Sequence, residues 1–63
     1  MRVIDLLRNH TWNMQALITE TDNVYTVLTQ IIHGPDLGLD KTVNYPSEKQ
    51  ARDYALTVLG MDN

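Results

Sequence analysis

The chain has 63 residues, 5 of them Lys or Arg and 8 Asp or Glu, giving a net charge of -3, and it contains no cysteine. The missing cysteine excludes disulfides and thiolate zinc sites, and a chain this short holds only one hydrophobic core. Residues 1–63 are therefore expected to form a single domain. Because no segment resembles a signal peptide or a membrane span, we expect this domain to be soluble and cytoplasmic.

Residues 2–9 are predicted to form a short first helix. Val3 and Ile4 precede Leu7 by four and three residues, which is the spacing of side chains on one face of a helix. Asn9 is a suitable residue for the helix end.

Residues 11–21 and 24–33 are predicted to form a β-hairpin. Apolar side chains alternate in the first run from Trp12 to Ile18, and the second run is rich in β-branched residues. Asp22 and Asn23 between them are turn-forming residues. A two-residue loop, or a four-residue loop with the same centre, pairs Met14 with Ile31, Ala16 with Thr29 and Ile18 with Val27. A three-residue loop would break this parity.

Residues 39–45 are predicted to form a third strand, after a turn over the Gly-Pro-Asp-Leu-Gly run of residues 34–38. Pro46 ends that strand, and Ser47 with Gln50 forms the capping box of a second helix that stops at Gly60. The core stripe of this helix is Ala51, Tyr54, Ala55, Val58 and Leu59.

The predicted fold is α+β with the element order α-β-β-β-α. A three-stranded antiparallel sheet carries both helices on one face, and the other face keeps apolar side chains among threonines and glutamines. These side chains are Leu17, Val24, Leu28 and Ile32. Because so small a core gains from association, this face is predicted to bind a partner, either a second copy of the chain or another protein.

The second predicted helix begins Ser47-Glu48-Lys49-Gln50-Ala51-Arg52, with Ala55 following. This run and the element order resemble a double-stranded-RNA-binding domain. The resemblance implies that Lys49 and Arg52 contact RNA phosphates across the major groove. Phosphate binding draws on several cations, whereas acidic residues outnumber basic ones here, so duplex RNA binding is the alternative hypothesis.

The remaining polar residues predict no chemistry. His10 and His33, with Asp36 and Asp40 in the following loop, lack the close spacing of a metal site, and the one serine, Ser47, serves as a helix cap. Trp12 is predicted to cover one end of the core, or to contact a partner if it is exposed. We therefore expect a non-enzymatic protein-interaction module without metal or cofactor, acting as a homodimer, an adaptor or an inhibitor through its sheet face.

Overall fold

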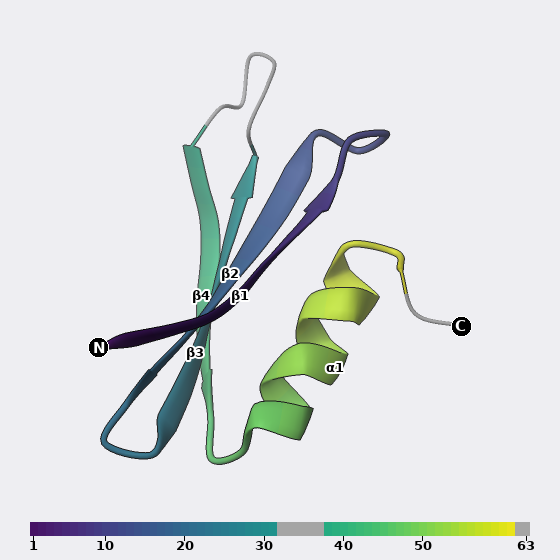
Figure 1. Cartoon of the computed structure of the whole chain (residues 1–63). Coiled ribbons are helices and arrows are strands. Elements are labelled where there is room, and N and C mark those ends of the chain that lie inside the picture. The colour runs from purple at the N-terminus through teal and green to yellow at the C-terminus, as the bar shows by residue number, and fades with distance from the viewer. Residues whose placement is uncertain (32–37, 62–63) are drawn as a thin grey trace.

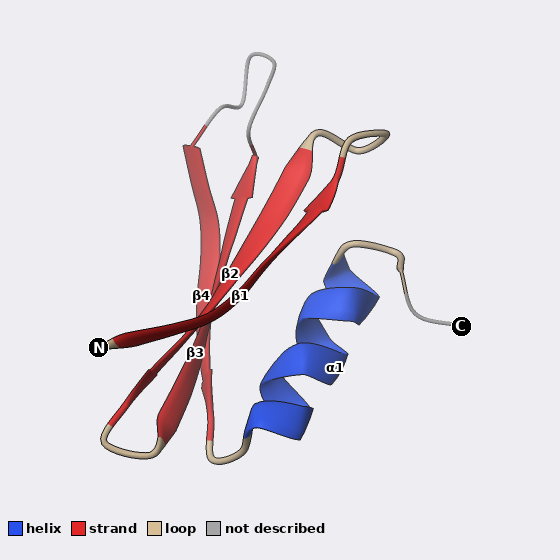
Figure 2. Ribbon diagram, viewed as in Figure 1, coloured by secondary structure: helices blue, strands red, loops and turns tan. Residues whose placement is uncertain are grey.

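The computed structural model describes residues 1–31 and 38–61, except for the side chains of residues 38–40. In these residues the chain forms four strands followed by one helix, as Figure 2 shows. The elements are β1 (Arg2–Asn9), β2 (Met14–Thr21), β3 (Val24–Ile31), β4 (Gly38–Tyr45) and α1 (Glu48–Val58). The class is α+β.

The four strands form one antiparallel sheet in the order β1-β2-β3-β4, so that each strand pairs with its neighbour in sequence. The helix α1 lies on one side of this sheet and packs against β2, β3 and β4. Figure 1 shows no other element of the described residues on the opposite side. The fold is thus two layers deep, and its shortest dimension is 15 Å.

The predicted layout of three strands and two helices is wrong, because residues 2–9 form the edge strand β1. A β-bulge explains the misleading spacing: Val3 pairs with Thr19 and Asp5 with Ile18, so Ile4 is an extra residue between the two pairs. Ile4 and Leu7 therefore both pack against the core although they are three residues apart. In an unbulged strand that spacing would place them on opposite faces.

The predicted hairpin is confirmed as β2 and β3, including its loop and register. Asp22 and Asn23 have positive φ angles of 51° and 66°, as a two-residue type I′ turn requires. The observed pairs include Met14 with Ile31, Ala16 with Thr29 and Ile18 with Val27. The strand β2 begins at Met14, later than predicted, and the last two residues of the second predicted strand, 32 and 33, lie outside the described residues.

The third predicted strand is β4, which pairs with β3 through Val43 opposite Val27 and Tyr45 opposite Tyr25. The register of this pair shifts between Thr29 and Gln30 of β3. The predicted turn before β4 lies outside the described residues, apart from its last position, Gly38.

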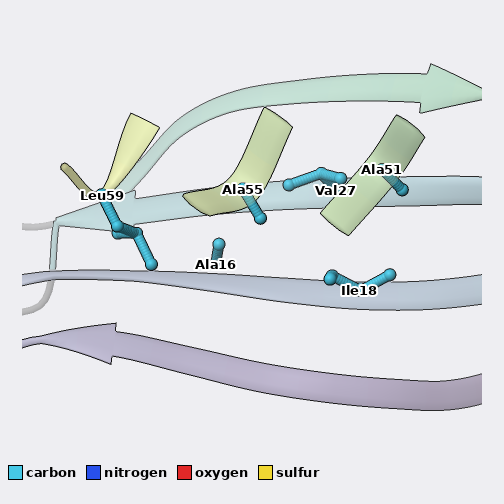
Figure 3. Packing of buried hydrophobic residues seen from close by; sticks show 6 residues of the cluster. All are labelled: Ala16, Ile18, Val27, Ala51, Ala55 and Leu59. Carbon is cyan, nitrogen blue, oxygen red and sulfur yellow. The ribbon is translucent and has the colours of Figure 1, made fainter. Parts of the chain in front are cut away.

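The predicted second helix is confirmed as α1. Ser47 is its N-cap, and the Ser47 hydroxyl accepts a hydrogen bond from the backbone N–H of Gln50. The helix places Ala51, Ala55 and Leu59 against the sheet, where each is fully buried. Figure 3 shows these three side chains opposite those of the sheet, and the core cluster consists of Ala16, Ile18, Val27, Ala51, Ala55 and Leu59.

Candidate protein-interaction face

The sheet face opposite α1 is called the open face. Strand alternation and the observed register assign its residues, because Ala16, Ile18 and Val27 point toward the helix and their neighbours point away. The described side chains of the open face are Val3, Leu6, Arg8, Gln15, Leu17, Thr19, Thr21, Val24, Thr26, Leu28, Gln30, Thr42 and Asn44.

Three leucines cross the middle of the open face in one row. Leu6 of β1 pairs with Leu17 of β2, and Leu17 pairs in turn with Leu28 of β3. We call these three residues the leucine row. Leu6 is 42% exposed, and Leu17 and Leu28 are half-buried. Cross-strand neighbours of this kind lie about 5 Å apart, so the row is a continuous apolar strip.

Polar side chains flank the leucine row on both sides. On one side, which we call the glutamine row, Arg8 Nε donates a hydrogen bond to Gln15 Oε1 at 3.1 Å, and Gln15 Nε2 donates one to Gln30 Oε1. On the other side, the threonine row, Thr26 Oγ1 donates to Asn44 Oδ1 at 2.8 Å. These lateral bonds hold the polar groups along the sheet, which leaves the leucines at the centre of an ordered surface.

The open face carries little charge. Of its described side chains only Arg8 is ionic, whereas the whole chain has a net charge of -3. Asp5 and Asp53 form ion pairs on the helix side, and Glu20 lies 3.6 Å from Arg2 in another. The acidic side chains among the described residues therefore lie away from the leucine row.

Three of the four residues predicted to bind a partner are among the described residues. Leu17, Val24 and Leu28 lie on the open face, and Leu17 pairs with Leu28. Val24 is 43% exposed at the turn end of β3, and Ile32 lies outside the described residues. The helix predicted for residues 2–9 concealed Leu6 and Val3, and the bulge at Ile4 breaks the simple alternation that would otherwise link Val3 to the face of Leu6 and Arg8.

The cations of the alternative RNA hypothesis lie on α1 and are ion-paired. Lys49 Nζ is 2.9 Å from Asp53 Oδ2, and this hydrogen bond raises the pKa of Lys49 above its ordinary value. Arg52 contacts Asp5 at 2.8 Å and Glu48 at 3.4 Å. The bond to Asp5 is the main cause of the raised pKa of Arg52. A phosphate would have to compete with these carboxylates.

Asp5 anchors the helix to the edge strand. Its carboxylate accepts hydrogen bonds from Arg52 and from the backbone N–H of Leu6, and these bonds, Arg52 first, lower the pKa of Asp5. The bulge turns Asp5 toward the helix side, opposite Ile18. This contact is a structural tie between β1 and α1.

Trp12 belongs to a corner where the β1–β2 connection meets the end of α1. It precedes β2 and is 52% exposed, and its indole ring lies against Gly60, whose φ is 67°. The Asn9 side chain donates a hydrogen bond to the Leu59 carbonyl and accepts one from the Trp12 backbone N–H. Trp12 thus covers the helix end and keeps half of its surface in solvent.

Of the histidines and carboxylates considered for metal binding, His10 is the one whose side chain is among the described residues. His10 is exposed in the β1–β2 connection, whereas His33, Asp36 and the side chain of Asp40 lie outside the described part. The described residues contain no group of three potential metal ligands. They also include no helix of the length and apolarity that crossing a membrane requires.

No protein-family model matches this chain, and neither a curated protein nor a solved structure shows significant similarity to it. Its function is therefore inferred from the geometry of its described residues.

Proposed function

We propose that this chain is a small non-enzymatic protein-interaction module that binds a protein partner through its open face. The observation that carries the proposal is the leucine row, in which Leu6, Leu17 and Leu28 lie side by side on a face that no described strand or helix covers (Figure 1). Single exposed apolar residues are common, but a continuous strip at the centre of a sheet face is typical of a binding surface.

The thinness of the core supports the same proposal. Among the described residues six apolar side chains are buried, and three of these are alanines. A domain of this size gains a modest free energy from its own core, and small domains without disulfides commonly gain more by association. Covering the leucine row would contribute about 25 cal/mol for each Å² of apolar surface removed from water.

The arrangement of the open face also resembles the anatomy of an interface. Protein interfaces have an apolar centre surrounded by a polar rim, with charged residues depleted at the centre. Here the leucine row is bordered by the glutamine row and the threonine row, whose amides and hydroxyls already bond to one another. A partner therefore meets polar groups that cost little to desolvate beside leucines that favour burial.

Site-specific photo-crosslinking tests this proposal. A photoreactive amino acid at Leu6, which is 42% exposed, is compared with the same amino acid at Met61, which is 43% exposed at the helix end. In cells that express the chain, we expect a protein adduct from position 6 and little or none from position 61. Equal yields at the two positions, or no adduct at position 6, would contradict a binding role for the open face.

Duplex RNA binding through Lys49 and Arg52 is the competing hypothesis. Both side chains are paired with carboxylates, which weakens it. Retention of duplex RNA at low salt that is lost in Lys49→Ala/Arg52→Ala, and that falls steeply as salt is raised, would favour RNA binding over the protein-interaction proposal.

A further inference from the structure

We infer that the partner of the open face is a second copy of this chain, packed face to face across a two-fold axis that runs along the leucine row. The inference rests on the proposed function, since it identifies the occupant of the same surface. Two-fold dimers are the commonest assemblies of identical chains, and their interface requires one surface that complements itself.

The charge distribution leaves the described open face with little of the like-charge repulsion that would oppose self-association. Two chains with a net charge of -3 repel each other through most of their surfaces, but the described open face has Arg8 as its one ionic side chain. Arg8 lies two residues along β1 from Leu6, so rotation about the leucine row carries it to the far side of that row. The two guanidinium groups are then separated by more than the Debye length of about 8 Å in physiological salt.

On β2 and β3 the polar rows match under the same rotation, whereas on β1 Arg8 of one copy lies over Val3 of the other. An axis along the leucine row places each leucine over its counterpart and exchanges the glutamine row with the threonine row. Gln30 of one copy then lies over Thr26 of the other, because these residues flank Leu28 on β3. Amide donors and acceptors thus face hydroxyl groups, with no described carboxylate between the sheets. Two sheets stacked in this way lie about 10 Å apart, with their strands within about 30° of alignment.

The available area is sufficient for a reversible dimer. Strands of 8 residues in a four-stranded sheet give a face about 26 Å long and about 19 Å wide, from the usual rise and strand spacing. Two such faces bury about 1,000 Å² in total, which is the lower bound for a specific interface. We therefore expect a dimer whose population depends on concentration within the micromolar to millimolar range.

The first test is the light-scattering mass of the purified chain as its concentration is raised to millimolar. We expect the mass to rise up to twofold for the wild type and to stay at one chain for Leu17→Lys/Leu28→Lys. The matched control Met61→Lys adds a charge at an exposed apolar residue of the helix end and should dimerise as the wild type does. Circular dichroism verifies that each variant is folded.

The second test leaves the leucine row intact and uses the absence of cysteine from the chain. A short bismaleimide should cross-link a mixture of Gln30→Cys and Thr26→Cys several-fold more than either variant alone. Equal yields for the mixture and the single variants would overturn the axis along the leucine row.

The outcomes separate this inference from the proposed function. A wild-type mass of one chain at every concentration overturns self-association. If the position-6 photo-crosslinker still captures a different protein, the open face remains an interaction surface with another occupant. If it captures nothing, both the inference and the proposed function fail.

Discussion

The two faces of the sheet differ in how the same strand is used. In β2, Ala16 and Ile18 point toward α1 and are fully buried, whereas Leu17 between them points to the open face and keeps part of its surface in solvent. Alternate side chains of one strand thus belong to two faces with different roles. The covered face holds the chain together, and the open face presents apolar surface that the chain does not bury by itself.

The sizes of the side chains sharpen this difference. The covered face joins Ala16 of the sheet to Ala51 and Ala55 of the helix, and these small residues let the helix approach the sheet closely. The open face instead displays the leucine row. The covered face thus has alanines at part of the contact between helix and sheet, and the open face leaves three leucines available for association.

The largest expected difference is between alanine substitutions at adjacent residues of β2. Ile18→Ala removes a fully buried side chain from the core and should lower the free energy of unfolding by about 2 to 5 kcal/mol. Leu17→Ala should cost about 1 kcal/mol or less where the chain is monomeric, because Leu17 is only half-buried. Urea unfolding at low protein concentration measures both values, and equal costs would contradict the division between the faces.

The next largest effect is expected at the corner that fixes the helix to the covered face. Gly60→Ala should cost about 1 to 3 kcal/mol, because a side chain is strained at a φ of 67°. The new Cβ would also lie 2.4 Å from the Trp12 ring. Thermal unfolding of Gly60→Ala, Trp12→Ala and the double variant separates the two causes. If the clash contributes, Gly60→Ala costs less in the Trp12→Ala background.

The elements that could be predicted from the sequence are those set by local chemistry. The turn at Asp22 and Asn23 fixes the hairpin register, because a two-residue loop allows one alignment of the flanking strands. Ser47 and Gly60 mark the ends of the helix for similar reasons, since a side-chain cap and a positive φ act within a few residues.

The first strand could not be predicted because its pattern depends on pairing with a distant segment. The bulge at Ile4 exists only in relation to β2, and it gives Ile4 and Leu7 a helix-like separation. The same error concealed one third of the leucine row, because a helix at residues 2–9 does not place Leu6 beside Leu17. The pairing of Leu17 with Leu28 on the open face could be predicted from the hairpin turn alone.

A smaller effect, an increase in stability, is expected from a substitution at Thr29 on the covered face of β3, with Thr26 on the open face as the matched control. Thr29 is fully buried on the covered face, and its hydroxyl has no hydrogen-bond partner among the described residues. Thr29→Val should therefore raise the free energy of unfolding by about 1 kcal/mol, since valine has nearly the same shape without the polar group. Thr26→Val on the open face removes the bond to Asn44 and should not stabilise. Denaturant midpoints measured at low protein concentration compare the two variants. Destabilisation by Thr29→Val would indicate that the Thr29 hydroxyl makes a hydrogen bond in the folded chain.

The smallest expected effect belongs to the ion pair that ties β1 to the covered side. Arg52 and the Leu6 N–H lower the pKa of Asp5 in the folded chain, so the ionised carboxylate favours folding above the ordinary aspartate pKa of about 3.9. This stability is lost as the pH falls through the lowered pKa of folded Asp5. Because the Asp5 side chain is 40% exposed, solvent screening keeps the contribution below about 1 kcal/mol.

Asp5→Asn should thus be slightly less stable than wild type at neutral pH. This difference in stability should close in strong acid and narrow at high salt. Asp53→Asn, which removes the partner of the exposed Lys49, is the control and should change stability less. Urea midpoints across acidic to neutral pH measure the difference, and a gap that widened in acid would contradict the stabilising role of ionised Asp5.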